Sequence, residues 1–176
     1  MSKKALIVVD MVNDFVDGAL PVGEPAKKIV PFIMEKIKEF HKNGDIVVFA
    51  CDSHKDGIDG NWPKHCDPDT DGAKLYGEIG EWYVANSGDM WIEEKETYDS
   101  FHNTGLTQWL RASDVEEVYV VGVCTDICIY STVAGAYFNG FKVNVFKDGC
   151  ATLEVFKDRE PQVYQMMKDY FFANII

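Results

Sequence analysis

The alternation of short apolar runs with amphipathic segments is the feature that most constrains what this chain can fold into. Apolar, β-branched runs bounded by charged or turn residues occur at 3–11, 45–52 and 142–149, with shorter ones at 90–94 and around Val120–Val123. Such runs are typical of strands in parallel sheets, because helices bury both faces of those sheets. The chain is therefore predicted to contain five buried strands.

Helical periodicity separates these runs. Segment 24–44 places apolar residues at helical spacing and Lys and Glu on the other face, and Gly44 suits its C-terminal end. Because a proline disrupts a helix interior, we expect this helix to begin near Pro31. Further helices are predicted at 104–113, from Ile127 to Gly140, and across 158–173.

Strands that alternate with helices favour a parallel sheet with helices on both faces. We predict one domain over residues 1–176, an α/β fold with three layers (αβα) and a mainly parallel, Rossmann-like sheet of five or six strands. The number stays open because the closing residues "FFANII" leave little room for a full sixth strand. Segment 53–90 is rich in Gly, Asp, Asn and Pro, so we expect a long functional loop with at most short helices.

The acidity of the chain limits the partners it can bind. Its 176 residues carry a formal net charge of −12, which disfavours binding to nucleic acid or to an anionic membrane. No apolar run approaches the ~20 residues of a membrane span, and Asp10 interrupts the N-terminal apolar stretch too early for a signal peptide. The five cysteines lack disulfide or zinc-ribbon spacing, so we expect free thiols and a cytoplasmic location.

Polar and nucleophilic residues follow the predicted strands at the points where they end. They are Asp10 after the first strand, Asp52 and His54 after the second, Lys95 after the third, and Cys124, Asp126 and Cys128 after the fourth. Because ligands bind at the carboxyl ends of parallel strands, we expect these side chains to converge at one edge of the sheet. The positive end of the following helix would also favour the thiolate form of Cys128.

Three of these residues also have ordinary structural explanations. Asp10 alone could cap the turn that follows it, Lys95 in "EEKET" could be a solvated charge, and Cys128 could be a small buried residue. These explanations become strained only if all three side chains lie at the same edge of one sheet. Their convergence is therefore the observation that favours catalysis.

A second cluster of reactive residues lies in the stretch "FACDSHKDGIDGNWPKHC". Asp52 and His54 are one residue apart, so their side chains fall on one side of an extended chain, and His65 follows a turn-rich loop. One carboxylate and two imidazoles suit Zn²⁺, Fe²⁺ or Mn²⁺, and we favour a divalent metal, with Zn²⁺ preferred. The alternative is that Asp52 caps a turn and the histidines are surface residues. Asp56 and Asp59 are candidates for a further ligand.

Four motifs follow one another in an order that resembles the isochorismatase-like cysteine hydrolases. They are "VVDMVNDF", "DSH" with "WPKHC", "KETYDSF" and "GVCTDIC", and they span the chain from residue 4 to about 150. The resemblance implies that family's fold. It also implies a catalytic triad of Asp10, Lys95 and Cys128, and a metal site at Asp52, His54 and His65.

The resemblance further implies how a substrate is held and attacked. The backbone amides of Cys124 and Cys128 would form the oxyanion hole, with a cis peptide before residue 124. Phe15 and Trp62, and with them Tyr98, would bind the substrate. The implied reaction is hydrolysis of the small molecule nicotinamide to nicotinate and ammonia through a thioester on the reactive cysteine, a step of NAD salvage.

Other functions remain to be weighed against this one. Another small-amide hydrolase or an isochorismatase-like enzyme of the same family is the nearest alternative, and isochorismate hydrolysis would not need the metal ligands. An aspartyl-nucleophile phosphatase is rejected because it requires a second acid where Val12 stands. The intact triad disfavours a non-catalytic binding protein. A homo-oligomer is left open, because an isologous contact surface leaves no plain sign in this sequence.

Overall fold

A parallel sheet forms the centre of the molecule. In a computed structural model that describes residues 3–55, 62–86 and 91–176, the strands lie in the order β3-β2-β1-β4-β5-β6, and all neighbours pair in parallel. Their bounds are Lys3–Val9 (β1), Ile46–Asp52 (β2), Trp91–Lys95 (β3), Val115–Val123 (β4), Lys142–Ala151 (β5) and Asn174–Ile175 (β6). This confirms the predicted α/β sheet and adds a sixth strand of two residues.

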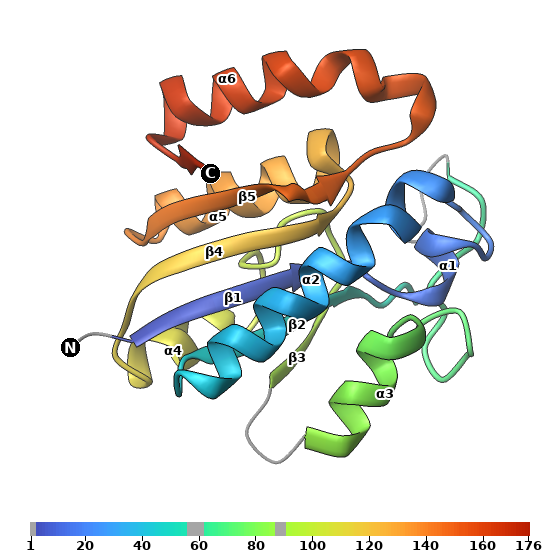
Figure 1. The fold of residues 1–176 in the computed structure, drawn as a ribbon, viewed down its shortest axis with the longest axis horizontal. Coiled ribbons are helices and arrows are strands. Elements are labelled where there is room, and N and C mark those ends of the chain that lie inside the picture. Colours follow the sequence, from blue (N-terminus) through green and yellow to red (C-terminus); the bar gives the residue numbers. More distant parts are fainter. Residues whose placement is uncertain (1–2, 56–61, 87–90) are drawn as a thin grey trace.

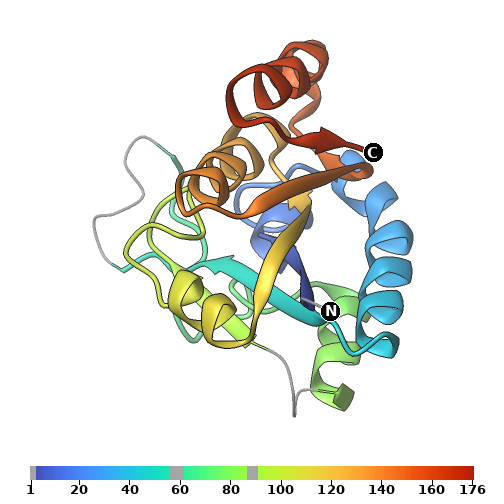
Figure 2. The same ribbon diagram turned by 90° about the vertical axis from the view of Figure 1, so that its left-hand side faces the viewer.

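Helices cover both faces of this sheet, as the alternation of elements requires. Figure 2 shows α2 and α3 on one side and α4 and α5 on the other, which makes three layers. The helices are Asn13–Val16 (α1), Glu24–Lys42 (α2), Gly77–Asn86 (α3), Leu106–Ala112 (α4), Tyr130–Phe138 (α5) and Glu160–Phe171 (α6). A π-helical turn, Thr125–Ile129, precedes α5, and a 3₁₀ turn, Glu154–Arg159, precedes α6. None of the described helices has the length and apolar character of a membrane span.

Alternate residues of β1 pack into two different hydrophobic cores. Leu6 and Val8 belong to the core beneath α2, whereas Ala5, Ile7 and Val9 belong to the core beneath α4, α5 and α6. All five side chains are at most 1 % exposed. A strand buried on both faces has no polar side to show, which is why β1 is a continuous apolar run in the sequence.

The first long helix begins earlier than the sequence pattern predicted. α2 starts at Glu24 and continues through Pro31 to Lys42, so the expectation of a start near Pro31 was wrong. Pro31 lies on the exposed face, where water can hydrogen-bond the carbonyl group that loses its N–H partner. The apolar face from Ala26 to Phe40 is buried on both sides of the proline, and this packing stabilises the helix across it.

The segment between β2 and β3 contains a loop and one helix. The structure describes residues 53–55 and 62–86 of this segment, and among them only α3 is helical. In Figure 1 the loop before α3 lies beside α1, at the end of the sheet to which the arrows of β1 and β2 point. The loop therefore covers the carboxyl ends of the strands, where a ligand site was predicted.

At Gly122 in β4 the two central strands, β1 and β4, approach each other closely. Its φ is +123°, and a Cβ atom there would lie 2.0 Å from the carbonyl oxygen of Val9 in β1. We expect Gly122→Ala to lower the free energy of unfolding by at least about 2 kcal/mol, because the added methyl group would force two paired backbones apart. Urea denaturation followed by circular dichroism measures the change.

Gly105→Ala is the matched control for this substitution. Gly105 has a φ of −82°, and the nearest atom to an added Cβ is 3.8 Å away. The control should therefore lose less than about 1 kcal/mol, mostly through its position at a helix N-terminus. Equal losses in the two variants would contradict the close approach of β1 and β4.

Candidate active site and metal cluster

Asp10 turns from the end of β1 toward β2. Its backbone adopts a left-handed conformation with a φ of +55°, and its N–H donates to the carbonyl oxygen of Ala50 at 2.8 Å. The side chain is 1 % exposed, and Oδ1 accepts the backbone N–H of Asp52 at 2.9 Å. Within the described part of the chain, Oδ2 has no aligned hydrogen-bond donor. Oδ2 is therefore the oxygen that can receive a proton.

Lys95, at the end of β3, is completely buried between two carboxylates. Its ammonium group lies 2.9 Å from Oδ2 of Asp10 and donates a hydrogen bond to Oδ1 of Asp52. It also donates to the carbonyl oxygen of Thr97 at 3.2 Å. The alternative that Lys95 is a solvated surface charge is therefore wrong.

Burial and neighbouring charges separate the pKa values of the two carboxylates. Burial, and then the charge of Asp52, raise the pKa of Asp10 to about 6 against the opposing effect of Lys95. Burial also acts to raise the pKa of Asp52, but Lys95 and His54 outweigh it and hold that pKa below its usual value. Burial alone would lower the pKa of Lys95, yet its anionic neighbours raise it well above the ordinary value. Lys95 is therefore protonated, and Asp10 is the better proton acceptor of the two carboxylates.

Cys128 lies in the π-helical turn, with Sγ within 4.8 Å of carboxylate oxygens of Asp10 and Asp52. Burial raises the pKa of its thiol well above the usual value; Lys95 opposes this shift and Asp10 adds to it. Burial therefore opposes the thiolate form that the helix terminus and Lys95 were expected to favour. The thiol proton has to leave as the sulfur reacts, and Asp10 is within reach to take it.

The turn that carries Cys128 also brings Cys124 to the site. The peptide bond between Val123 and Cys124 is cis, at the position that the resemblance implied. The carbonyl oxygen of Cys124 accepts the N–H groups of Ile127 and Ile129, each at 3.1 Å. Cys124 and Cys128 both line the same cavity. The two backbone amides expected to form an oxyanion hole thus belong to one short, hydrogen-bonded turn.

Asp126, which was expected to converge with these residues, does not line the cavity. Its carboxylate accepts the hydroxyl of Thr152 and lies 3.7 Å from the guanidinium of Arg159. The hydroxyl of Thr125, its buried neighbour, donates to Glu160 at 2.6 Å. The hydrogen bond to Thr152 ties the turn to the end of β5, and the hydrogen bond to Glu160 ties it to the start of α6. Asp126 therefore anchors the backbone of the turn. Spacing along the sequence could not indicate that its side chain contacts Thr152 and Arg159.

Asp52, His54 and His65 form a buried cluster that can hold a metal ion. Their ligand atoms all lie within 4.8 Å of one another, and Nε2 of His54 is 3.4 Å from Oδ2 of Asp52. Two ligands on one tetrahedral Zn²⁺, each about 2.0–2.1 Å from the ion, are about 3.3 Å apart, so this spacing fits a shared ion. Asp56 and Asp59, the candidates for a further ligand, lie outside the described residues.

The hydrogen bond of His65 indicates which of its ring nitrogens carries the proton. Nδ1 lies 2.6 Å from the carbonyl oxygen of Pro63, and since a carbonyl can only accept, Nδ1 carries the proton. Nε2 then has a lone pair, an arrangement typical of metal-binding histidines. His54 and His65 are only 6 % and 3 % exposed, so the alternative that they are surface residues is wrong.

One cavity joins the candidate catalytic residues to the candidate metal cluster. It holds about 430 Å³, counting the part open to solvent, and its wall includes Asp10, Asp52, His65 and Cys128. Lys95 stands behind the wall, where it contacts both carboxylates without facing the cavity. The predicted triad and the predicted metal ligands therefore meet at one site.

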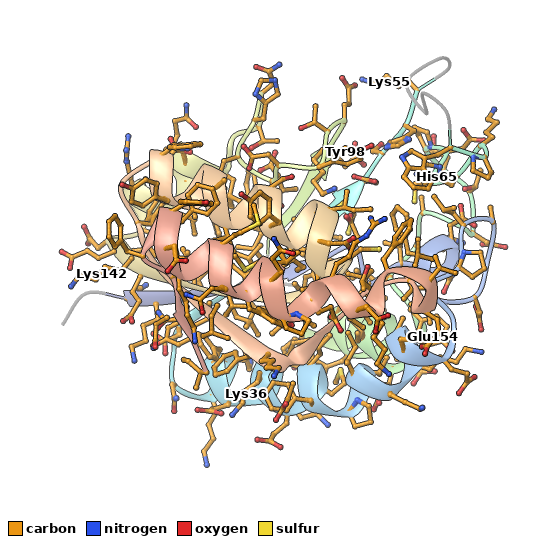
Figure 3. The ribbon with its side chains drawn as sticks, turned by 90° about the horizontal axis from the view of Figure 1, so that it is seen from above. Lys36, Lys55, His65, Tyr98, Lys142 and Glu154 are labelled. Carbon is orange, nitrogen blue, oxygen red and sulfur yellow. The ribbon has the colours of Figure 1, made fainter. Side chains whose placement is uncertain are left out.

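Three aromatic side chains from separate segments wall this cavity. The ring of Phe15 in α1 packs edge-on against His65, with 5.1 Å between the centroids. The indole N–H of Trp62 donates to the hydroxyl of Tyr98 at 3.0 Å, which joins the loops that follow β2 and β3. Figure 3 places Tyr98 and His65 at the same end of the molecule, away from Lys142 at the start of β5. A planar substrate would meet these rings beside the metal cluster.

Besides Val123 at the end of β4, four further residues line the cavity that the sequence did not single out for a site. They are Leu20, Val22, Ile127 and Leu153. They lie in loops and in the turn before α5, where a single apolar residue produces no periodic signal. Their role in the site depends on how distant segments pack, so no pattern in the sequence could have revealed it.

Comparisons with known proteins agree over nearly the whole chain. The isochorismatase domain matches residues 4–176. An isochorismatase family protein of Bacillus subtilis (strain 168), PncA, is 40% identical over 159 residues, which cover 85% of this chain and 87% of the relative. The crystal structure of nicotinamidase PncA from Bacillus subtilis superposes with a TM-score of 0.92, at 34% identity and over 98% of both chains. The pyrazinamidase of Pyrococcus horikoshii in complex with zinc gives a TM-score of 0.88, at 32% identity and over 99% of this chain and 98% of that one.

Lys95→Met should remove the charge that allows two carboxylates to be buried side by side. With Asp10 and Asp52 left uncompensated, we expect the free energy of unfolding to fall by about 3–5 kcal/mol. Urea denaturation of the metal-free protein in EDTA measures this loss.

Lys27→Met is the control for a surface ion pair. The ammonium of Lys27 lies 3.2 Å from Asp17, and its side chain is 39% exposed. Its loss should lower the free energy of unfolding far less than the loss of Lys95 does, because solvent screens an exposed ion pair. A loss at Lys95 as small as that at Lys27 would contradict the buried ion-pair arrangement.

Proposed function

This chain belongs to the isochorismatase family, and from that premise we propose that it is a metal-containing cysteine amidohydrolase that converts nicotinamide to nicotinate and ammonia in NAD salvage. The observation that carries the proposal is the single cavity at which Cys128, Asp10 and the metal cluster meet. The similarity to the Bacillus subtilis nicotinamidase and the Pyrococcus horikoshii pyrazinamidase supports an aromatic carboxamide as substrate.

In the proposed reaction Asp10 transfers the protons. It takes the proton of the Cys128 thiol as Sγ attacks the carboxamide carbon, and the carbonyl oxygen becomes an oxyanion. Asp10 then gives this proton to the amide nitrogen, the C–N bond breaks, and ammonia leaves a thioester on Cys128. Water attacks the thioester with Asp10 again as base, which releases nicotinate and restores the thiol. Lys95 holds Asp10 in place throughout, 2.9 Å from its Oδ2.

The oxyanion needs donors that are in place before the attack. We assign this role to the backbone amides of Cys124 and Cys128, because both residues line the cavity on one short turn. The turn is bonded to Thr152, directly after β5, and to Glu160 in α6, which limits its movement. A single oxyanion donor typically contributes ~10²–10³ in rate.

The metal cluster and the aromatic walls would orient the substrate. Asp52, His54 and His65 would hold one divalent cation, for which we propose Zn²⁺ ahead of Fe²⁺ or Mn²⁺. When bound, the cation supplies an electrophilic partner for the ring nitrogen of nicotinamide. Phe15, Trp62 and Tyr98 line the cavity and provide apolar contact for the ring.

The compartment of the reaction follows from the cysteines. All five lie within the described residues and are free thiols. Free buried thiols suit a reducing compartment, so we propose a cytoplasmic enzyme. The acidic surface favours a small-molecule substrate over nucleic acid as the partner.

Ammonia release from a panel of amides tests the proposed function. The purified protein, with its metal content measured in the same preparation, is given nicotinamide, pyrazinamide, benzamide and aliphatic amides. We expect nicotinamide to react at least about 10²-fold faster than the aliphatic amides, because remote contacts to the ring position the carboxamide. A preference for aliphatic amides would favour another small-amide hydrolase of the family.

Two cysteine variants control the same assay. Cys128→Ala should lower ammonia release by at least about 10⁴-fold, because no nucleophile remains. Cys150→Ala removes a buried thiol outside the cavity and should retain activity. Near-normal turnover by Cys128→Ala would end the thioester mechanism.

His54→Ala should abolish metal binding. Two protein ligands would remain of the three in the cluster, so we expect bound metal after dialysis to fall from about one per chain to near zero, and KM for nicotinamide to rise. Elemental analysis measures the metal. His41→Ala, on the exposed end of α2, is the control and should keep its metal. Metal content that survives the loss of His54 would refute the site.

A further inference from the structure

The position of His65 needs an explanation, because its own segment has no regular structure. Residues 62–74, all within the described part of the chain, contain no helix or strand. A metal ligand has to be held close to its productive geometry by surrounding contacts. The groups that hold this loop are therefore candidates for positioning residues of the metal site.

The N-terminal motif "VVDMVNDF" supplies the first of these contacts. The N–H of Asn13 donates to the carbonyl oxygen of Lys74, and the N–H of Asp14 donates to that of Gly72, each at 2.9 Å. The side-chain amide of Asn13 donates to the carbonyl oxygen of Asp71 at 2.7 Å. The start of α1 is thus bonded along the far part of the loop that carries His65.

The carboxylate of Asp14 reaches further into the same loop. Its Oδ2 accepts the backbone N–H of Cys66 at 2.8 Å, and its Oδ1 accepts the N–H of Ala19 at 3.0 Å. The fit is close, because a Cβ atom added at Gly72 would lie 2.1 Å from Oδ2. Asp14 is not among the residues that line the cavity, so it has no part in the chemistry proposed above.

Cys66 connects this carboxylate to both histidines of the cluster. It is fully buried, follows His65 directly and has a φ of +50°, a conformation that residues other than glycine rarely adopt. Its N–H binds Asp14, and its carbonyl oxygen accepts the backbone N–H of His54 at 3.0 Å. One residue, held by Asp14, therefore fixes the backbone beside His65 and the backbone of His54.

We propose that Asp14 is a positioning residue of the metal site, which acts through Cys66 to hold His54 and His65 toward Asp52. The inference rests on the proposed metal site and adds to it a residue that touches neither metal nor substrate. Each oxygen of the Asp14 carboxylate accepts one N–H group, so both oxygens are needed as acceptors. An asparagine has the same shape but only one acceptor oxygen, and its NH₂ group would face one of the two donors.

Zinc affinity of the metal-free protein tests the proposal. We expect Asp14→Asn to weaken Zn²⁺ binding by about 10- to 100-fold, the range typical of groups that orient metal ligands. Competition titration of Zn²⁺ against a chromophoric chelator measures the affinity without reference to catalysis. Asp17→Asn, in the same segment but on an exposed carboxylate paired with Lys27, is the matched control and should bind zinc as the wild type does.

A second variant and a second measurement separate positioning from simple stability. Gly72→Ala keeps Asp14 but would displace its carboxylate, so it should weaken zinc binding as well. Thermal unfolding of each metal-free variant, followed by circular dichroism, identifies the temperature at which it is folded, and the titrations are made there. If folded Asp14→Asn and Gly72→Ala bind zinc as tightly as the wild type, the anchor is refuted while the metal site stands. If the wild type itself takes up no zinc, the metal site and the anchor are refuted together.

Discussion

The ion pairs of the buried Lys95 ammonium group are the interactions on which the end of the molecule with the candidate site depends. Asp10 and Asp52 face each other at the ends of the neighbouring strands β1 and β2, and burying both carboxylates without a cation would cost several kcal/mol per ion. Lys95 ends β3, on the other side of β2, and contacts both. One positive charge therefore holds together the ends of three strands. The positions of the residues that follow these strands depend on it.

Asp52 connects Asp10, the proposed proton acceptor, to the proposed metal cluster. One of its oxygens accepts the hydrogen bond of Lys95, and the other lies 3.4 Å from Nε2 of His54. A charge added at the cluster would therefore act on Asp10 at short range, in surroundings where burial strengthens electrostatic effects. The proposed anchor at Asp14 acts on the peptide next to His65. The cluster would then be held both by the sheet, through Asp52, and by the loop, through Cys66.

Local pattern was enough to predict most of the fold, and the exceptions have physical causes. The apolar run of β1 and the buried face of α2 are properties of neighbours along the chain, and both were predicted. Pro31 was misjudged because a local rule penalises proline inside a helix, whereas the packing of α2 on either side compensates for it. β6 has only two residues and is a strand through its pairing with β5, for example Val145 with Ile175. A pairing of two residues produces no periodic pattern in the sequence.

The sequence by itself determined the succession of strands and helices and the residues that end each strand, because these depend on spacing and on nearby neighbours. It also identified Asp10, Lys95 and Cys128 as a group. Only the tertiary structure decided that Asp126 bonds to Thr152 and does not line the cavity, that Leu153 lines it, and that burial raises the pKa of the Cys128 thiol. These properties arise from contacts between distant segments and from the loss of water around buried groups, and spacing along a chain expresses neither.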